Sequence, residues 1–214
     1  MTNTTSEPGV GPRDQHNQLL PVMVTSSDPQ ERAKKSRVPT PEHGGTMRVL
    51  VISDSHGRND DVAGVIKQVG PIDMLIHCGD VERGDNYIRS LVDCPVHMVA
   101  GNNDYNLDLP SKDIFEIGDY KVMVVHGHTY YVYRDVRYLR QYAIDNHIDI
   151  VMFGHTHKPF IEIGDEVTIL NPGSLSYPRQ SDHKPTFLLM EIDEDGEAHF
   201  GHGYYHSKFS ELKI

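Results

Sequence analysis

From Met47 onward the chain alternates short apolar runs with segments of helical periodicity. The runs lie at residues 49–52, 74–76, 96–100, 122–125, 148–153, 167–170 and 187–192. Short apolar runs bounded by turn-forming residues predict buried strands. This pattern constrains the fold more than any other feature, because strands separated by helices bury their faces in a layered sheet.

Two segments between the runs carry apolar residues at helical spacing. They are residues 59–69, with Val62, Val65, Ile66 and Val69, and residues 134–147, with Val136, Leu139, Ala143 and Ile144. Asn59 is expected to cap the first helix, with acidic residues in the first turn behind it. Residues 194–197 predict the turn of a hairpin near the end of the chain. The whole pattern predicts an α/β fold.

The first 46 residues differ from the rest in composition. They contain no Phe, Tyr or Trp and hold six of the thirteen prolines. With so little to bury, this segment cannot offset its ordering entropy, so we predict a disordered N-terminal extension over residues 1–46. Gly44 and Gly45 stand just before Met47, and glycine codons can spell a purine-rich ribosome-binding sequence, so Met47 is a second candidate for the start of translation. We expect one domain, residues 47–214.

The charge of the chain lies in this domain. Residues 1–46 hold five acidic and five basic side chains, so 26 of the 31 acidic and 15 of the 20 basic residues lie in residues 47–214. An acidic domain argues against a groove that binds nucleic-acid phosphates. No apolar run approaches the roughly 18 residues of a membrane span. Cys78 and Cys94 are too few for a disulfide framework, and no secretory signal is evident. We expect a cytoplasmic protein without membrane contact.

Polar residues follow five consecutive apolar runs, usually beside a glycine. These segments are Asp54-Ser55-His56, Gly79-Asp80, Gly101-Asn102-Asn103-Asp104, His126-Gly127-His128 and Gly154-His155-Thr156-His157. Ligands of open α/β sheets bind outside the carboxyl ends of the strands. Alternate residues of an extended chain face one side, so His155 and His157 can address the same point. We therefore expect the five segments to meet in one site.

Seven of these side chains form a set of candidate metal ligands. They are Asp54, His56, Asp80, Asn102, His126, His155 and His157. Two carboxylates, four imidazoles and one amide oxygen, without a thiolate, suit Mn, Fe, Ni, Co or Zn. Seven groups exceed what one ion needs, whereas two ions that share one carboxylate would use them all. Two such ions outweigh the charge of two aspartates, so the site should attract phosphate.

The five segments, in this order and at this spacing, resemble the signature of the calcineurin-like metallophosphoesterase superfamily. The similarity runs from Met47 to about Arg179. The small size and the segment NPGSLSYPR at residues 171–179 resemble the compact YfcE-like phosphodiesterase group. The resemblance implies a four-layer αββα sandwich of two mixed β-sheets, with a dinuclear metal site at the carboxyl ends of the strands.

The resemblance also implies how the ligands are shared between two ions. By motif position, one ion would be held by Asp54, His56, Asp80 and His157, and the other by Asp80, Asn102, His126 and His155. Asp80 would then bridge the two. Mn is the expected metal, with Ni, Fe, Co and Zn as alternatives.

One position departs from the signature of the superfamily. The histidine of its G-N-H motif, thought to protonate the leaving group or steady the transition state, is Asn103 here. An amide cannot act as a general acid. We expect Asn103, Asp104 and His128 to be the catalytic residues next to the ions, with His128 either orienting a ligand or touching the substrate. Poor leaving groups should be cleaved inefficiently.

Four further residues are candidates for substrate binding. Arg58 and Arg179 could clamp a phosphate oxygen, and the alternative for both is a solvated surface position. Asn171 and Ser174 stand in a segment of turn chemistry, whose backbone N–H groups could contact an anion.

We interpret the chain as a metal-dependent phosphodiesterase that acts on a small phosphate ester through two-metal activation of a bridging water. A first alternative is a protein-interaction scaffold on the same fold, which the retromer subunit of the superfamily resembles. Scaffolds of that kind tend to lose metal ligands, and all seven are present here. A second alternative is a nuclease, which the acidic domain and the lack of a DNA-capping domain disfavour. A homo-oligomer is compatible with such a compact fold.

Overall fold

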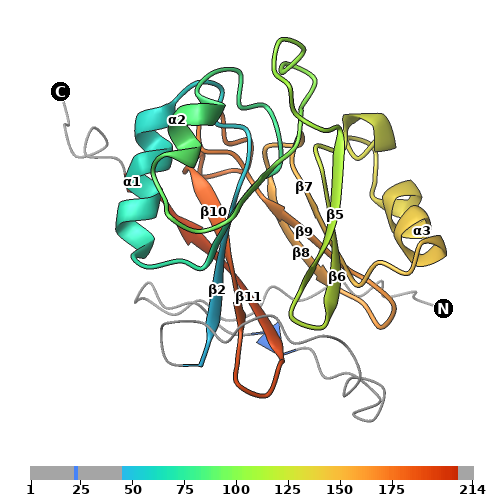
Figure 1. The fold of residues 1–214 in the computed structure, drawn as a ribbon. Helices are drawn as coiled ribbons and strands as arrows, with labels where there is room; N and C mark the ends of the chain where they lie inside the picture. The colour runs from blue at the N-terminus through green and yellow to red at the C-terminus, as the bar shows by residue number, and fades with distance from the viewer. Residues whose placement is uncertain (1–21, 24–44, 207–214) are drawn as a thin grey trace, which may run out of the picture.

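The computed structural model of the protein describes residues 22–23 and 45–206 (Figure 1). The prediction of a disordered extension therefore falls almost wholly outside the described residues. The described chain forms two mixed β-sheets. The six-stranded sheet has the order β1-β11-β10-β2-β3-β4, and the five-stranded sheet has the order β5-β6-β7-β9-β8.

The strands of the six-stranded sheet are β1 (Val22–Met23), β2 (Met47–Ile52), β3 (Met74–His77), β4 (Val96–Met98), β10 (Thr186–Ile192) and β11 (Ala198–Tyr204). Those of the five-stranded sheet are β5 (Lys112–Ile117), β6 (Tyr120–Val125), β7 (Ile150–Phe153), β8 (Pro159–Ile163) and β9 (Thr168–Pro172). The helices are α1 (Asn59–Val69), α2 (Asp85–Arg89) and α3 (Arg137–Asp145), with a short 3₁₀ turn, η2, at His128–Tyr130. All seven predicted strands are present. The hairpin predicted at residues 194–197 joins β10 and β11.

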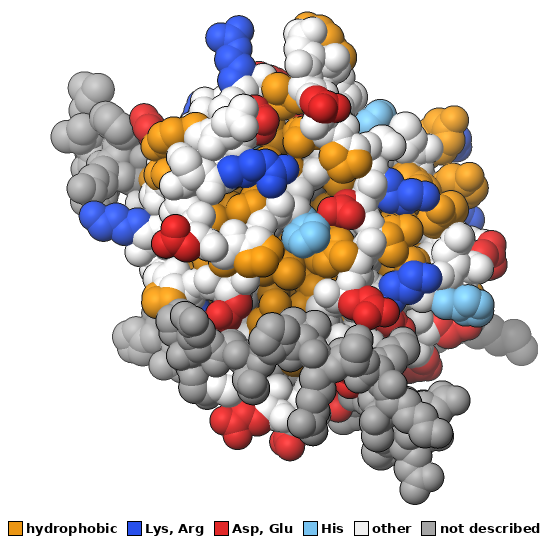
Figure 2. Space-filling model, viewed as in Figure 1, with side chains coloured by type: hydrophobic (Ala, Val, Ile, Leu, Met, Phe, Trp, Pro, Cys, Tyr) orange, Lys and Arg blue, Asp and Glu red, His pale blue; other side chains and the backbone are white. Residues whose placement is uncertain are grey.

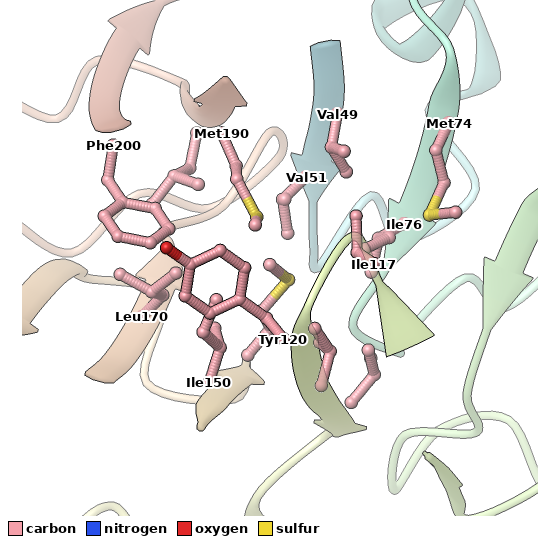
Figure 3. Packing of buried hydrophobic residues seen from close by; sticks show 14 of the residues in the cluster. Val49, Val51, Met74, Ile76, Ile117, Tyr120, Ile150, Leu170, Met190 and Phe200 are labelled. Carbon is pink, nitrogen blue, oxygen red and sulfur yellow. The ribbon is translucent and has the colours of Figure 1, made fainter. Parts of the chain in front are cut away.

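The two sheets pack face to face through the central hydrophobic cluster. Figure 3 shows Val49 and Val51 of β2 in this cluster with Ile150 of β7 and Leu170 of β9. Adjacent residues of a strand face opposite sides, so Leu50 and Ile52, which alternate with Val49 and Val51, point to the outer face of the six-stranded sheet.

Helices cover the outer faces of both sheets. Val62 and Val65 of α1 and Ile88 of α2 belong to the cluster on the six-stranded sheet. Leu139 and Ala143 of α3 belong to the cluster on the five-stranded sheet. Helix, sheet, sheet and helix thus form four layers, which confirms the predicted αββα architecture. None of the described helices has the length and apolar character needed to cross a bilayer.

The helix boundaries differ from two predictions. Asn59 is not the N-cap of α1 but its first residue; Arg58 precedes it, and no side chain caps the helix. The Asn59 amide instead packs against Gly84, where a Cβ atom would lie 2.1 Å from its Nδ2. Helix α3 begins later than residue 134, because the Asp135 side chain accepts the backbone N–H of Arg137 at 3.0 Å and makes a turn there.

The sheet order brings the five polar segments to one edge of the sandwich. Strands β2, β3 and β4 are parallel neighbours, as are β6 and β7. Parallel neighbours end at the same edge of a sheet, and each of these five strands is followed by one of the polar segments. The loops after the strands therefore supply the candidate ligands from both sheets.

Candidate metal centre

Five of the seven predicted ligands have a left-handed backbone. The φ angles are 53° at Asp54, 45° at His56, 54° at Asp80, 66° at His155 and 58° at His157. This conformation costs a residue with a Cβ atom about 1–2 kcal/mol. Such strain gathers at functional sites, where the surrounding structure holds it in place. The sharp turns direct these side chains toward the edge of the sandwich where the five polar segments meet.

The strained loops are tied to one another through the backbone. The N–H of Asp54 donates to the carbonyl of Gly79 at 3.0 Å, and that of His56 donates to the carbonyl of Asp80 at 3.0 Å. Two glycines leave room for this approach. A Cβ atom at Gly101 would lie 2.1 Å from Asp80 Oδ1, and one at Gly154 would lie 2.9 Å from Asp54 Oδ2. These glycines stand beside the ligands because the carboxylates need the space.

Asp54, His56, Asp80 and His157 form the first subsite. One ligand atom from each lies within 4.8 Å of all the others. His157 Nε2 is 3.1 Å from Asp54 Oδ1 and 3.4 Å from His56 Nε2. His56 Nε2 is 3.8 Å from Asp80 Oδ2. Asp54, Asp80 and His157 are buried. This is the four-residue set that the family resemblance implies for one ion.

The hydrogen bonds of the first subsite fit a cation. Asp54 Oδ1 is buried without a hydrogen-bond partner, although buried polar atoms are nearly always paired. His157 Nδ1 lies 2.8 Å from the carbonyl oxygen of Tyr177, and His56 Nδ1 lies 2.6 Å from Glu82 Oε1. A proton on each Nδ1 satisfies these acceptors and leaves Nε2 as a free donor of electrons, as metal-binding histidines require.

Asn102, His126 and His155 form the second subsite, next to Asp80. His126 Nε2 lies 3.2 Å from Asn102 Oδ1 and 3.5 Å from Asp80 Oδ2. The His126 and His155 rings are 5.1 Å apart. His126 Nδ1 lies 2.8 Å from the carbonyl oxygen of Cys78, which again leaves Nε2 free. Asn102 is exposed and His155 is half-buried, so this subsite is the more open of the two.

Asp80 lies between the two subsites. Its Oδ2 atom is 3.8 Å from His56 Nε2 on one side and 3.5 Å from His126 Nε2 on the other. Burial opposes ionisation of Asp80, but the hydrogen bond and charge of His126 hold the pKa of Asp80 well below its usual range. The carboxylate is therefore anionic at neutral pH and can serve both sides.

The pKa values of the two imidazoles in the second subsite shift in opposite directions. Burial lowers the pKa of His155, and so does the neighbouring His126. Burial also opposes the charged form of His126, but its hydrogen bond to Asp80 raises the pKa of His126 above the ordinary value. His155 is thus held as a neutral imidazole, the form that binds a metal ion.

The three predicted catalytic residues have different partners. The Asn103 backbone N–H donates to Asp80 Oδ1 at 2.9 Å, and its amide Nδ2 donates to Asp80 Oδ2 at 2.8 Å. Asp104 is buried and accepts backbone N–H groups, including that of Glu82 at 2.6 Å. His128 lies with its ring 5.5 Å from that of His126, and its Nδ1 atom is buried without a partner. Asn103 and His128 border the subsites, whereas Asp104 braces a loop.

Asn171 and Ser174 lie beneath the site. Both side chains are fully buried. Asn171 Nδ2 donates to the carbonyl of Gly154 at 2.8 Å, and Ser174 Oγ donates to the carbonyl of Asp54 at 2.9 Å. Side chains with no exposed surface and with these partners hold the ligand loops. An anion contact from the backbone N–H groups of this segment stays a prediction.

The two arginines lie on the surface near the first subsite. Arg58 is held over the ring of Tyr177, with Cζ 5.5 Å from the ring centroid. The Tyr177 ring in turn lies 5.1 Å from the His56 ring. Arg179 is exposed, and its backbone N–H donates to the carbonyl of His157 at 2.9 Å. Both guanidinium groups therefore belong to segments that touch the ligands.

Sequence reasoning missed two residues of the site, Glu82 and Tyr177. Glu82 is the partner of His56, and Tyr177 supplies a carbonyl to His157 and a ring to Arg58. Glu82 follows Asp80 by two residues, and Tyr177 lies in the segment at residues 171–179 that resembles the YfcE-like group. Closeness to a ligand in the chain was the signal that could have found Glu82.

Known proteins share both the sequence pattern and the fold. A sequence model of the calcineurin-like phosphoesterase superfamily domain matches residues 47–195. A probable metallophosphoesterase of Methanocaldococcus jannaschii is 41% identical over 140 residues, which cover 64% of this chain and 72% of the relative. One from Bacillus subtilis is 31% identical over 150 residues, which cover 70% of this chain and 86% of the relative.

Solved structures agree with these relatives. A conserved protein of Streptococcus pneumoniae, described as a predicted phosphoesterase, has a TM-score of 0.62 and is 30% identical, over 70% of this chain and 85% of its own. Wild-type Vps29 of Entamoeba histolytica, solved with Zn²⁺, has a TM-score of 0.58 and is 26% identical, over 75% of this chain and 100% of its own. On this match of motifs, fold and sequence, the chain belongs to the calcineurin-like phosphoesterase superfamily.

Proposed function

We propose that the protein is a phosphodiesterase that hydrolyses a small phosphate diester with two divalent metal ions. Mn²⁺ is the first candidate, and Ni, Fe, Co and Zn are alternatives that suit the same donors. The observation that carries the proposal is the position of Asp80, whose Oδ2 atom lies within 3.8 Å of an imidazole nitrogen in each subsite. One carboxylate between two sets of ligands is the arrangement of two-metal sites.

The residues of the site divide the work of binding. When bound, the ions would neutralise phosphate charge and activate water for in-line attack. His126 and His157 keep Nε2 toward the ions because their Nδ1 atoms face backbone carbonyls. Asp54 and Asp80 supply the negative charge from buried positions. Rigid ligands of this kind lower the cost of ordering the site during catalysis.

Arg58 is the best-placed side chain to contact the phosphate from the protein. Its ion pair with Asp61 is long, at 3.9 Å, and the Arg58 side chain is 53% exposed. Exposed ion pairs contribute little, so Asp61 leaves the guanidinium available. Contact with the Tyr177 ring keeps it beside the first subsite. Arg179 is exposed and its backbone contacts His157, so it is a second candidate for phosphate contact.

Asn103 shapes the choice of substrate. Its amide cannot protonate a leaving oxygen, and in the structure it donates to Asp80. His128, which lies near the second subsite, is the neighbour that could replace the missing acid. A site without a strong general acid favours leaving groups that are stable as anions, such as a nitrophenolate, over simple alkoxides.

The test is hydrolysis of a nitrophenyl phosphodiester by protein stripped of metal with EDTA. We expect no turnover in the stripped protein and recovery on addition of Mn²⁺, followed by activity on a panel of cyclic nucleotides, dinucleotides and monoesters. Full activity in EDTA would contradict metal dependence. Hydrolysis of monoesters but of no diester would leave a phosphoesterase and contradict the phosphodiesterase assignment.

A protein-interaction scaffold is the main alternative, and the similarity to Vps29 structures favours it. Vps29 of Cryptosporidium parvum shares the fold with a TM-score of 0.57 at 21% identity. Metal-replete protein that hydrolyses no phosphate ester would support the scaffold. A nuclease is a second alternative. Figure 2 shows Lys and Arg side chains scattered singly among acidic and apolar ones, without a continuous basic track on that face.

The remaining predictions concern the setting of the enzyme. Cys78 and Cys94 are free thiols, as expected for a reducing compartment, which supports a cytoplasmic location. The proposed partner is the small phosphate ester itself. A homo-oligomer stays a prediction, and light scattering of the purified protein would test it.

A further inference from the structure

We propose that Glu82 is a positioning residue of the metal centre, which fixes the orientation and the tautomer of His56 and thereby sets the affinity of the first subsite. The inference rests on the proposed two-metal function. The central contact is that between Glu82 Oε1 and His56 Nδ1, at 2.6 Å. A carboxylate at this distance accepts the Nδ1 proton and leaves Nε2 to bind the ion.

The partner of His56 differs from those of the neighbouring histidines. His126 and His157 place Nδ1 against backbone carbonyls, whereas His56 places it against a side-chain carboxylate. A carboxylate beside Nδ1 is a charged acceptor and holds the Nδ1 proton more strongly than a neutral carbonyl does. The first subsite therefore holds the one ligand among these three whose strength depends on a replaceable side chain.

The backbone at Glu82 is held for this contact. Glu82 has a φ angle of 62°, in the left-handed region that favours glycine. Asp104 Oδ1 accepts the Glu82 N–H at 2.6 Å, and Asp104 Oδ2 accepts the N–H groups of Val81 at 3.1 Å and Gly101 at 2.8 Å. Asp104 is buried. The hydrogen bonds from Asp104 hold the left-handed backbone of Glu82 in place, and this conformation directs the Glu82 side chain toward His56.

The exposure of the pair suits this role. The His56 side chain is 8% exposed and that of Glu82 is 39% exposed. The carboxylate thus approaches from the solvent side and covers the outer nitrogen of an otherwise enclosed ligand. Replacing it should leave the fold intact, because little of the core touches it.

The experiment measures Mn²⁺ binding to metal-free protein by calorimetry, with four proteins in parallel. They are wild type, Glu82→Gln, Glu82→Gly and the control Glu166→Gln, whose side chain is exposed on the turn between β8 and β9. Glu82→Gln keeps the shape and removes the charge. Glu82→Gly relieves the left-handed backbone and removes the side chain. Nitrogen NMR of the metal-free proteins reports which His56 nitrogen carries the proton.

We expect two binding events in wild type and in Glu166→Gln. Glu82→Gln should weaken one event by about 10- to 100-fold, the usual loss when such a partner is removed, and leave the other unchanged. Glu82→Gly should weaken the same event although its melting temperature is equal or higher. The proton should no longer be fixed on Nδ1 of His56 in Glu82→Gly, whereas the amide oxygen of Glu82→Gln can still accept it.

The outcomes separate the inference from the function. Unchanged isotherms for both Glu82 variants would overturn the role of Glu82, whatever the activity. Equal weakening of both events would also overturn it, because a positioning residue of His56 acts on one subsite. Wild-type protein that binds only one ion would contradict the two-metal function, while the effect of Glu82→Gln on that ion would still decide the inference.

Discussion

The two subsites of the metal centre are built to different degrees of completeness. In the first, four ligand atoms already lie within 4.8 Å of one another, and three of the four residues are buried. In the second, Asn102 is exposed and His155 is half-buried, and the His126 and His155 rings are 5.1 Å apart. A preformed site loses less freedom when it binds, so the first subsite should bind its ion more tightly.

This difference in burial indicates that the two subsites have different roles. The closed subsite is suited to hold one ion permanently, and the open one leaves room for a second ion with the substrate beside it. Asn103 and His128 border the open side, where a leaving group would depart. Asp80 couples the two because both subsites use its Oδ2 atom.

The largest effect should come from removing the shared charge. Asp80→Asn keeps the shape of the side chain and loses the anion that both subsites use, so occupancy of both should fall and turnover should drop by several orders of magnitude. Metal analysis by mass spectrometry and diester hydrolysis check this. Two ions per chain and near-normal turnover in Asp80→Asn would show that the subsites are not coupled through this residue.

A gain of function should follow at the open side. Asn103→His restores the residue of the superfamily signature and should speed cleavage of alkyl diesters by at most the ~10²–10⁴-fold that general acids contribute. The nitrophenyl rate should barely change, because that leaving group needs no proton. The measurement is kcat/KM of wild type and Asn103→His on an alkyl diester and on a nitrophenyl diester. If wild type cleaves both at equal rates with chemistry limiting, another group supplies the proton, and His128→Gln would be the variant to identify it.

Single ligand losses should distinguish the subsites. His157→Ala should weaken the tighter of the two Mn²⁺ binding events, and His155→Ala should weaken the weaker one. We expect each affinity to fall by at least about 10- to 100-fold, because loss of a ligand's hydrogen-bond partner alone has an effect of that size. His199→Ala, in the hairpin strand β11, is the matched control and should bind like wild type. Identical isotherms for His157→Ala and His155→Ala would mean that the closed and the open subsite do not differ in Mn²⁺ affinity.

The smallest effect should appear far from the metal centre, at the β10–β11 hairpin, which adjoins the start of β2 through the Ile192 and Met47 pairing. A hydrogen bond from His199 lowers the pKa of Asp193 below its ordinary value, although burial opposes this shift. Its contribution to stability is therefore complete above the unfolded pKa and is lost as pH falls through the folded one.

Asp193→Asn should accordingly lower the melting temperature slightly at pH 7, by no more than the ~1 kcal/mol typical of exposed pairs. The difference from wild type should shrink as the pH drops below about 4, and metal binding should not change. Thermal unfolding of both proteins across this pH range checks the sign. A difference that grows toward acid would contradict the assigned direction.

Much of the fold was predictable because buried strands and amphipathic helices leave periodic signals. The strands that escaped lie at sheet edges. β5 (Lys112–Ile117) mixes charged and apolar residues in the sequence KDIFEI, with exposed Lys112 and Ile114, and so lacks an apolar run. Helix α2 (Asp85–Arg89) is five residues long and is held by the burial of Ile88 rather than by a repeating pattern.

The candidate ligands were predictable from their motifs, but the residues that support them were not. The contact between Glu82 and His56 depends on left-handed backbone at both residues, which no side-chain pattern encodes. Asn171 and Ser174 were predicted first as turn residues, and the sequence did not show that both side chains are buried and bonded to the ligand loops. His77 is buried beside Ser55, and burial lowers its pKa to about 4.

The central claim is that two ions share Asp80 between a closed and an open subsite. Crystals grown with Mn²⁺ and measured at the manganese absorption edge test it most directly, because anomalous scattering locates the ions without assumptions about their ligands. The account predicts two peaks roughly 3.5–4 Å apart, with Asp80 Oδ2 between them and the peak at Asp54, His56 and His157 the more fully occupied. A single peak, or two peaks that Asp80 does not join, would contradict it.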